Sequence, residues 1–185
     1  MDLLPSGDHL LPTGDHLRAD RSERTDAASR RSDAGPTRAD RLLEGAKGGL
    51  IATLVMTAFR MPIARSPPPT AVFWSKFVAG GEPGDHTLPA LALHLCYGIG
   101  AGALFGPLAP IRGASDAAAE ARREETGLLW GLAYAVALSL FGERAVLGLL
   151  LGMDLDSDER LVFHVGHLIY GLTLGTWLGS RASDR

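Results

Sequence analysis

Charge is scarce over most of this sequence, and so are cysteine and lysine. The 185 residues include a single cysteine, Cys96, which excludes an internal disulfide and leaves the redox compartment open. The formal net charge is −3 and no basic stripe is interleaved with aromatic residues, which gives no support to a nucleic-acid partner. The metal-binding motifs H-E-x-x-H and C-x-x-C are also missing. Apolar sequence is therefore the dominant feature, and its distribution carries most of the information.

The N-terminal segment is richer in charge than the rest of the chain. Residues 1–41 hold 15 of the 39 charged residues, and the heptapeptide LPSGDHL at 4–10 is followed at once by LPTGDHL at 11–17. This segment has too little apolar surface to offset the entropy lost on ordering. We therefore predict a disordered, low-complexity N-terminal tail over 1–41, and a short C-terminal tail over 181–185.

The sequence between these tails, 42–180, predicts an all-α domain of four transmembrane helices. A helix needs about 20 mainly apolar residues to cross a bilayer. A soluble helical bundle would need a charged face along each helix, and stretches such as LALHLCYGIGAGALFGPLAPI offer none. The predicted spans lie at about 43–62, 88–108, 126–141 and 160–179. The third span either continues to 152 or is followed by a re-entrant segment over 142–152.

The distribution of arginine and lysine predicts the orientation of these spans. Positive charges close to span ends are retained on the cytoplasmic side of a membrane. Positive charges are about twice as numerous on the side that carries the N-terminus as on the other side. We therefore predict a multi-pass protein of the cell membrane with both termini in the cytoplasm.

One pattern of polar residues and glycines is written twice. HLCYGIGAGALFG at 94–106 and HLIYGLTLGTWLG at 167–179 share His, Leu, Tyr and three Gly at the same offsets. Steps of four place the glycines on one stripe of each helix, where small residues let two backbones approach closely. This internal repeat predicts a four-helix bundle made of two tandem helical hairpins, related by a pseudo-twofold axis along the membrane normal. The predicted packing residues are Gly45 and Gly49 in the first span, Gly98, Gly102 and Gly106 in the second, Gly127 and Gly131 in the third, and Gly171, Gly175 and Gly179 in the fourth.

Polar side chains within the spans are biased toward the predicted outer half. His94 and His167 would lie about six or seven residues, roughly 9–10 Å, below the outer surface. Ionisable residues at such depth are costly and mark functional sites, although a histidine bonded to a tyrosine or a carbonyl for helix association is an equally good explanation. The candidates for an outward-facing polar site are His94, Tyr97, His164, His167, Tyr170, Arg60, Glu143 and Arg144.

Three connecting segments carry signals of their own. The segment from Ala71 to Val78, which follows three prolines, predicts a short interfacial helix that either anchors the protein or covers the outer site. Asp156 with Glu159 predicts a capping box at the start of the fourth span. Ser115 predicts the cap of a charged helical lead-in to the third span.

Four stretches of the chain carry a resemblance to a known group. They are GLIATLVMTAFRMPI, PPTAVFWSKFVAGG, HLCYGIGAGALFG and DERLVFHVGHLIYGLTLGTWLG, which together make up about a third of the sequence. In these stretches the chain resembles small archaeal integral membrane proteins of unknown function and, more distantly, is similar to YagU-like inner-membrane proteins. The resemblance implies a four-span fold and supplies neither a reaction nor catalytic residues.

Three functions fit this pattern, with the lipid bilayer as the expected partner. The first is passage of protons or a small solute through the His-containing site, since intramembrane His and Glu are common relay groups. A homo-oligomer would suit it, because four helices enclose little lumen. The second is a non-catalytic structural protein held together by a His–Tyr packing network. The third is an intramembrane metal-binding protein or metalloenzyme holding zinc or copper. The histidine spacing supports a metal only weakly, so we expect no cofactor and no enzymatic activity.

Overall fold

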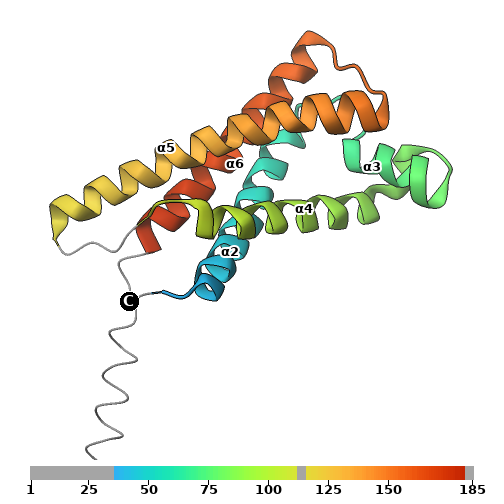
Figure 1. Ribbon diagram of the computed structural model, residues 1–185. Coiled ribbons are helices and arrows are strands. Elements are labelled where there is room, and N and C mark those ends of the chain that lie inside the picture. The colour runs from blue at the N-terminus through green and yellow to red at the C-terminus, as the bar shows by residue number, and fades with distance from the viewer. Residues whose placement is uncertain (1–35, 112–115, 182–185) are drawn as a thin grey trace, which may run out of the picture. The chain divides into compact units, whose positions relative to one another are not determined.

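The computed structural model describes residues 36–111 and 116–181, and within these ranges all regular structure is helical (Figure 1). Most of the predicted disordered tail, residues 1–35, lies outside the described residues, as do Ser115 and residues 182–185. The elements are α2 (Arg38–Arg60), α3 (Pro69–Trp74), η1 (Ser75–Ala79), η2 (Pro83–His86), α4 (Thr87–Leu108), α5 (Ala117–Phe141), η3 (Gly142–Leu151) and α6 (Ser157–Arg181).

The four predicted membrane spans are confirmed, with different boundaries. Four helical segments are long and apolar enough to cross a membrane: Arg38–Arg60, Pro83–Leu108, Ala117–Leu151 and Ser157–Arg181. The first span starts earlier than predicted, because residues 38–41, assigned to the tail, already belong to α2. The charged lead-in to the third span is helical, but its cap is Asp116, whose carboxylate accepts a hydrogen bond from the Ala119 N–H at 2.7 Å.

The third span continues beyond Phe141 rather than turning back into the membrane. Residues 142–151 form the π-helical segment η3, in which hydrogen bonds reach one residue further than in an α-helix. Within it there is no proline that would interrupt the backbone hydrogen bonds. The helix ends at Gly152, whose φ of 68° is a left-handed conformation that glycine adopts without steric cost.

The bundle consists of two tandem hairpins. Helix α2 packs against α4, α5 packs against α6, and the contact of α2 with α6 joins the two pairs. The predicted glycines lie in the hairpin contacts: a Cβ at Gly102 would meet the Gly49 Cα at 2.6 Å, and a Cβ at Gly131 would meet the Gly175 Cα at 3.0 Å. Both distances are shorter than the 3.5–4.0 Å of a normal carbon contact, so glycine is needed for this approach.

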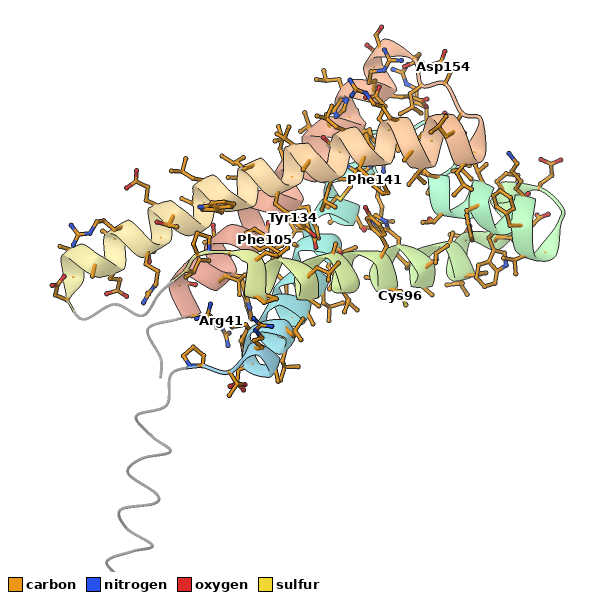
Figure 2. The ribbon with its side chains drawn as sticks, viewed as in Figure 1. Arg41, Cys96, Phe105, Tyr134, Phe141 and Asp154 are labelled. Carbon is orange, nitrogen blue, oxygen red and sulfur yellow. The ribbon has the colours of Figure 1, made fainter. Side chains whose placement is uncertain are left out.

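A small apolar core lies where the two hairpins meet. Phe105 of α4 stacks on Tyr134 of α5 with ring centroids 4.8 Å apart, and Figure 2 shows these two side chains together between the two helices. Leu174 is fully buried in the same cluster. Many large apolar side chains point outward instead, among them Leu149, which is 87% exposed, and Leu88, which is 78% exposed. Exposed apolar surface on this scale fits a protein surrounded by lipid.

The connection between α2 and α4 contains the expected short helix. Pro69 occupies the first turn of α3, where its missing N–H costs nothing, and the helix continues as η1 to Ala79. Lys76 donates to the carbonyl oxygens of Leu150 and Leu151, at 3.3 and 3.0 Å, at the end of η3. A cation beside the last carbonyls of a helix is favourable, so Lys76 attaches this connection to the third span.

Candidate functional site

The end of the bundle where α2 and η3 finish and α4 and α6 begin holds the polar residues, and we call it the polar end. His167 of α6 is buried, with 6% of its surface exposed. Its Nδ1 lies 2.9 Å from the carbonyl oxygen of Phe163, one turn earlier. Because a carbonyl oxygen only accepts, Nδ1 must carry the hydrogen of this bond. In a neutral ring, Nε2 is then left as an acceptor.

His94 and His167 line the same small cavity although they come from different hairpins. The cavity has a volume of about 10 Å³, and Thr53, Met56 and Tyr170 also line it. That volume is about what one water molecule needs. The hydroxyl of Thr53 donates to the Gly49 carbonyl at 2.6 Å, which leaves the oxygen of Thr53 available as an acceptor.

The two tyrosines of the repeated motif, Tyr97 and Tyr170, both line this cavity but differ in exposure and in hydrogen bonding. Tyr170 is 3% exposed and its hydroxyl donates to the carbonyl of Gly98 at 2.7 Å, which ties α6 to α4. Tyr97 is 41% exposed on α4. A second tyrosine bond, from Tyr134 to the carbonyl of Ala101 at 2.8 Å, was not expected from the sequence, because Tyr134 belongs to neither copy of the motif.

The remaining acidic and basic candidates, Glu143, Arg144 and Arg60, do not form one group. Glu143 makes an ion pair with Arg160 at 2.8 Å, and Nε2 of His164 lies 3.3 Å from its other carboxylate oxygen. Arg144 is exposed. Arg60 lies elsewhere, over Gly166 of α6, where an added Cβ would come within 3.2 Å of its Cδ. Glu143 and Arg60 therefore belong to different groups of residues.

The three histidines do not converge on one point. Nε2 of His164 lies beside the carboxylate of Glu143, whereas His94 and His167 line the small cavity. Within residues 36–111 and 116–181, no group of three or more His, Cys, Asp or Glu side chains is placed to hold a metal ion. The described donor atoms thus offer no preformed zinc or copper site.

A larger cavity at the polar end was missed by sequence reasoning, and we call it the end pocket. It has a volume of about 250 Å³ and lies between the chain that follows α2 and the beginning of α6. Its walls include Arg60 and Arg65 on one side and Asp158 and Glu159 on the other. The Ser66 hydroxyl donates to the Glu159 carboxylate across it, over 93 positions of sequence, so no local pattern could reveal this contact.

The start of α6 explains how Glu159 becomes available to Ser66. Asp156 accepts a hydrogen bond from the Glu159 N–H at 2.8 Å, which confirms it as the predicted cap. In a complete capping box the Glu159 carboxylate would reach back to the backbone at Asp156. Here it receives the bond from Ser66 instead, so the second half of that prediction is wrong.

Together the fold and these cavities define a helical, multi-pass membrane protein with a polar site near one end of its bundle. No protein-family model matches the chain, and neither the curated proteins nor the solved structures provide a match.

Proposed function

We propose that this protein passes protons, or a small solute, through a His-containing polar site that faces the outside of the cell. The single observation that carries the proposal is the cavity shared by His94 and His167. A volume of about 10 Å³ admits one water and no larger solute, which favours a proton as the species that reaches this point. Histidine is suited to the task because its ordinary pKa lies near physiological pH.

The proposed orientation, with both termini in the cytoplasm, rests on the positive charges close to the helix ends. The end opposite the polar end carries four of these positive charges: Arg41, Lys47, Arg123 and Arg181. Counted over the whole sequence, that side has the excess of arginine and lysine that marks the cytoplasmic face. The polar end would then face outward.

The half of the bundle below the two histidines is held closed by close contacts. The bond from Tyr170 to Gly98 and the stacking of Phe105 on Tyr134 lie there, beside the glycine contacts of both hairpins. A proton that enters from the polar end would therefore need the two hairpins to move apart before it leaves on the other side. A wider conduit for a solute would require a second copy of the chain.

We also propose that the two hairpins arose by duplication. Gly45 and Gly49 of α2 face Gly102 and Gly98 of α4 in the same order in which Gly127 and Gly131 face Gly175 and Gly171. The contact of α2 with α6 is much larger than that of α5 with α4, so the symmetry would be imperfect. That departure is consistent with the different environments of Tyr97 and Tyr170.

The test is a proton-flux assay on the full chain reconstituted in liposomes that contain a pH-sensitive dye. We expect His94→Gln and His167→Gln each to lower the flux driven by a potassium diffusion potential at least tenfold. His164→Gln is the matched control, because His164 lies on the same helix as His167 and outside the cavity. If the wild-type protein gives no more flux than empty liposomes, the proposal is refuted.

The second candidate is a structural membrane protein without transport. It is favoured by the buried bond from Tyr170 to Gly98, which joins the two hairpins as a packing network would. In that case His167→Gln would lower the melting temperature, and the wild type would have no flux to lose. Melting the same preparations that are used for the flux assay separates the two candidates.

A further inference from the structure

The end pocket combines one incompletely paired cation with an apolar lining, and we propose that it binds a small organic carboxylate. The carboxylate would pair with Arg60, and its hydrocarbon part would lie against apolar residues of the pocket wall. This proposal goes beyond proton passage and does not depend on it. The charge of the ligand and the apolar character of its hydrocarbon part are both inferred from the residues that line the cavity.

Arg60 carries the argument for a negatively charged ligand. It is half-buried at the end of α2, and among the described residues none accepts a hydrogen bond from its buried Nε. Glu159 is near enough to attract the guanidinium, yet the two form no ion pair, and the Glu159 carboxylate takes the hydroxyl of Ser66. Nε itself has almost no accessible surface, so the ligand would meet the terminal nitrogens of the guanidinium, and arginine matches a carboxylate with two parallel bonds.

The opposite wall limits how much charge the ligand can carry. Asp158 and Glu159 line the same pocket across from Arg60 and Arg65, so the four side chains sum to no net charge. A doubly charged phosphate would be repelled by the two acidic groups more strongly than a single carboxylate, which carries half that charge. An ammonium group on the same ligand would be tolerated near Asp158, which is exposed.

The size and the lining indicate the rest of the ligand. A volume of about 250 Å³ corresponds to roughly eight water molecules at about 30 Å³ each, which suits a short-chain acid and excludes a nucleotide. Apolar side chains supply much of the surface, and they are Ile63, Met153, Leu155, Val162 and Phe163. A ligand this small gains little binding energy in total, so the expected Kd is about millimolar.

The experiment compares three probes on the detergent-solubilised full chain, with the melting temperature as readout. Isovalerate is the probe acid, isoamylamine has the same carbon skeleton with the opposite charge, and inorganic phosphate represents a free phosphate or a lipid headgroup. We expect isovalerate to raise the melting temperature saturably and the other two to leave it unchanged. An equal shift by isoamylamine, a shift by phosphate alone, or no shift by isovalerate at 50-fold above the expected Kd, about 50 mM, would overturn the proposal.

Two variants locate the binding. Arg60→Gln should raise the Kd of isovalerate at least tenfold. Arg144 is exposed and lies outside the pocket, so Arg144→Gln should leave the Kd of isovalerate unchanged. Should Arg60→Gln fail to fold, Val162→Trp fills the pocket while keeping Arg60 and should abolish the shift. Retained binding in Arg60→Gln or Val162→Trp would place the acid elsewhere. The outcome is independent of the flux assay, so either proposal can fail alone.

Discussion

Replacing Gly102 with alanine tests whether close backbone contact holds the first hairpin together. The Cβ of Gly102→Ala would lie 2.6 Å from the Cα and 2.8 Å from the backbone nitrogen of Gly49, and still nearer to the carbonyl oxygen of Gly45. Normal carbon contacts are about 3.5–4.0 Å. Because all three neighbours are backbone atoms of α2, no side chain can rotate away, and the two helices must separate by about 1 Å.

The expected cost follows from overpacking, which typically destabilises by about 1–3 kcal/mol. Alanine also has a higher helix propensity than glycine, by about 1 kcal/mol, and this gain would hide part of the overpacking cost. The matched control is Gly100→Ala on the same helix, where an added Cβ meets nothing within 4 Å. Both variants gain the same propensity, so Gly102→Ala should be less stable than Gly100→Ala by about 1–3 kcal/mol.

The assay is equilibrium unfolding of the full chain in mixed micelles, followed by far-UV circular dichroism as the mole fraction of dodecyl sulfate rises. Gly102→Ala should unfold at a clearly lower fraction than Gly100→Ala. Gly175→Ala, which would meet the backbone of Gly127 and Gly131, extends the test to the second hairpin. Equal stability of Gly102→Ala and Gly100→Ala would refute the close approach of α2 and α4.

Two further predictions concern polar contacts. Tyr170→Phe removes the hydroxyl that bonds α4 and should lower the unfolding free energy by about 0.5–1.5 kcal/mol in the same assay, whereas Tyr97→Phe should change it little. A loss as large for Tyr97→Phe would contradict the different environments of the two tyrosines. A double-mutant cycle on Glu143 and Arg160, which are 25% and 45% exposed, should give a coupling energy below about 1 kcal/mol. The same cycle on Glu143 and Arg60 should give none, and measurable coupling there would mean that the two groups meet.

Local sequence features were enough to find the helices and most of their packing faces. Each span contains a long, mainly apolar stretch, and glycines four residues apart must share one face of a helix. The helix ends were less predictable: residues 38–41 look like the polar tail that precedes them, and Asp116 rather than Ser115 caps the third span. Adjacent polar residues with similar capping ability cannot be ranked from sequence alone.

The sequence named candidate residues for a polar site, but it did not indicate which of them lie together. His94 and His167 share a cavity, as their matching positions in the motif allowed, but His164 and Glu143 face another way. On a helix, His164 and His167 are three residues apart and nearly on the same face. In the structure, Nε2 of His164 nevertheless lies beside the Glu143 carboxylate, whereas Nδ1 of His167 bonds the Phe163 carbonyl of its own helix.

The sequence by itself determined that this is a four-helix membrane protein and where its small-residue faces lie. These properties depend on apolar length and helical periodicity, both of which are local. Only the tertiary structure decided that Tyr170 bonds α4 while Tyr97 is exposed, and that Arg60, Ser66 and Glu159 surround one pocket. Those contacts join positions as much as 93 residues apart, and their geometry depends on how two hairpins pack, which no local pattern specifies.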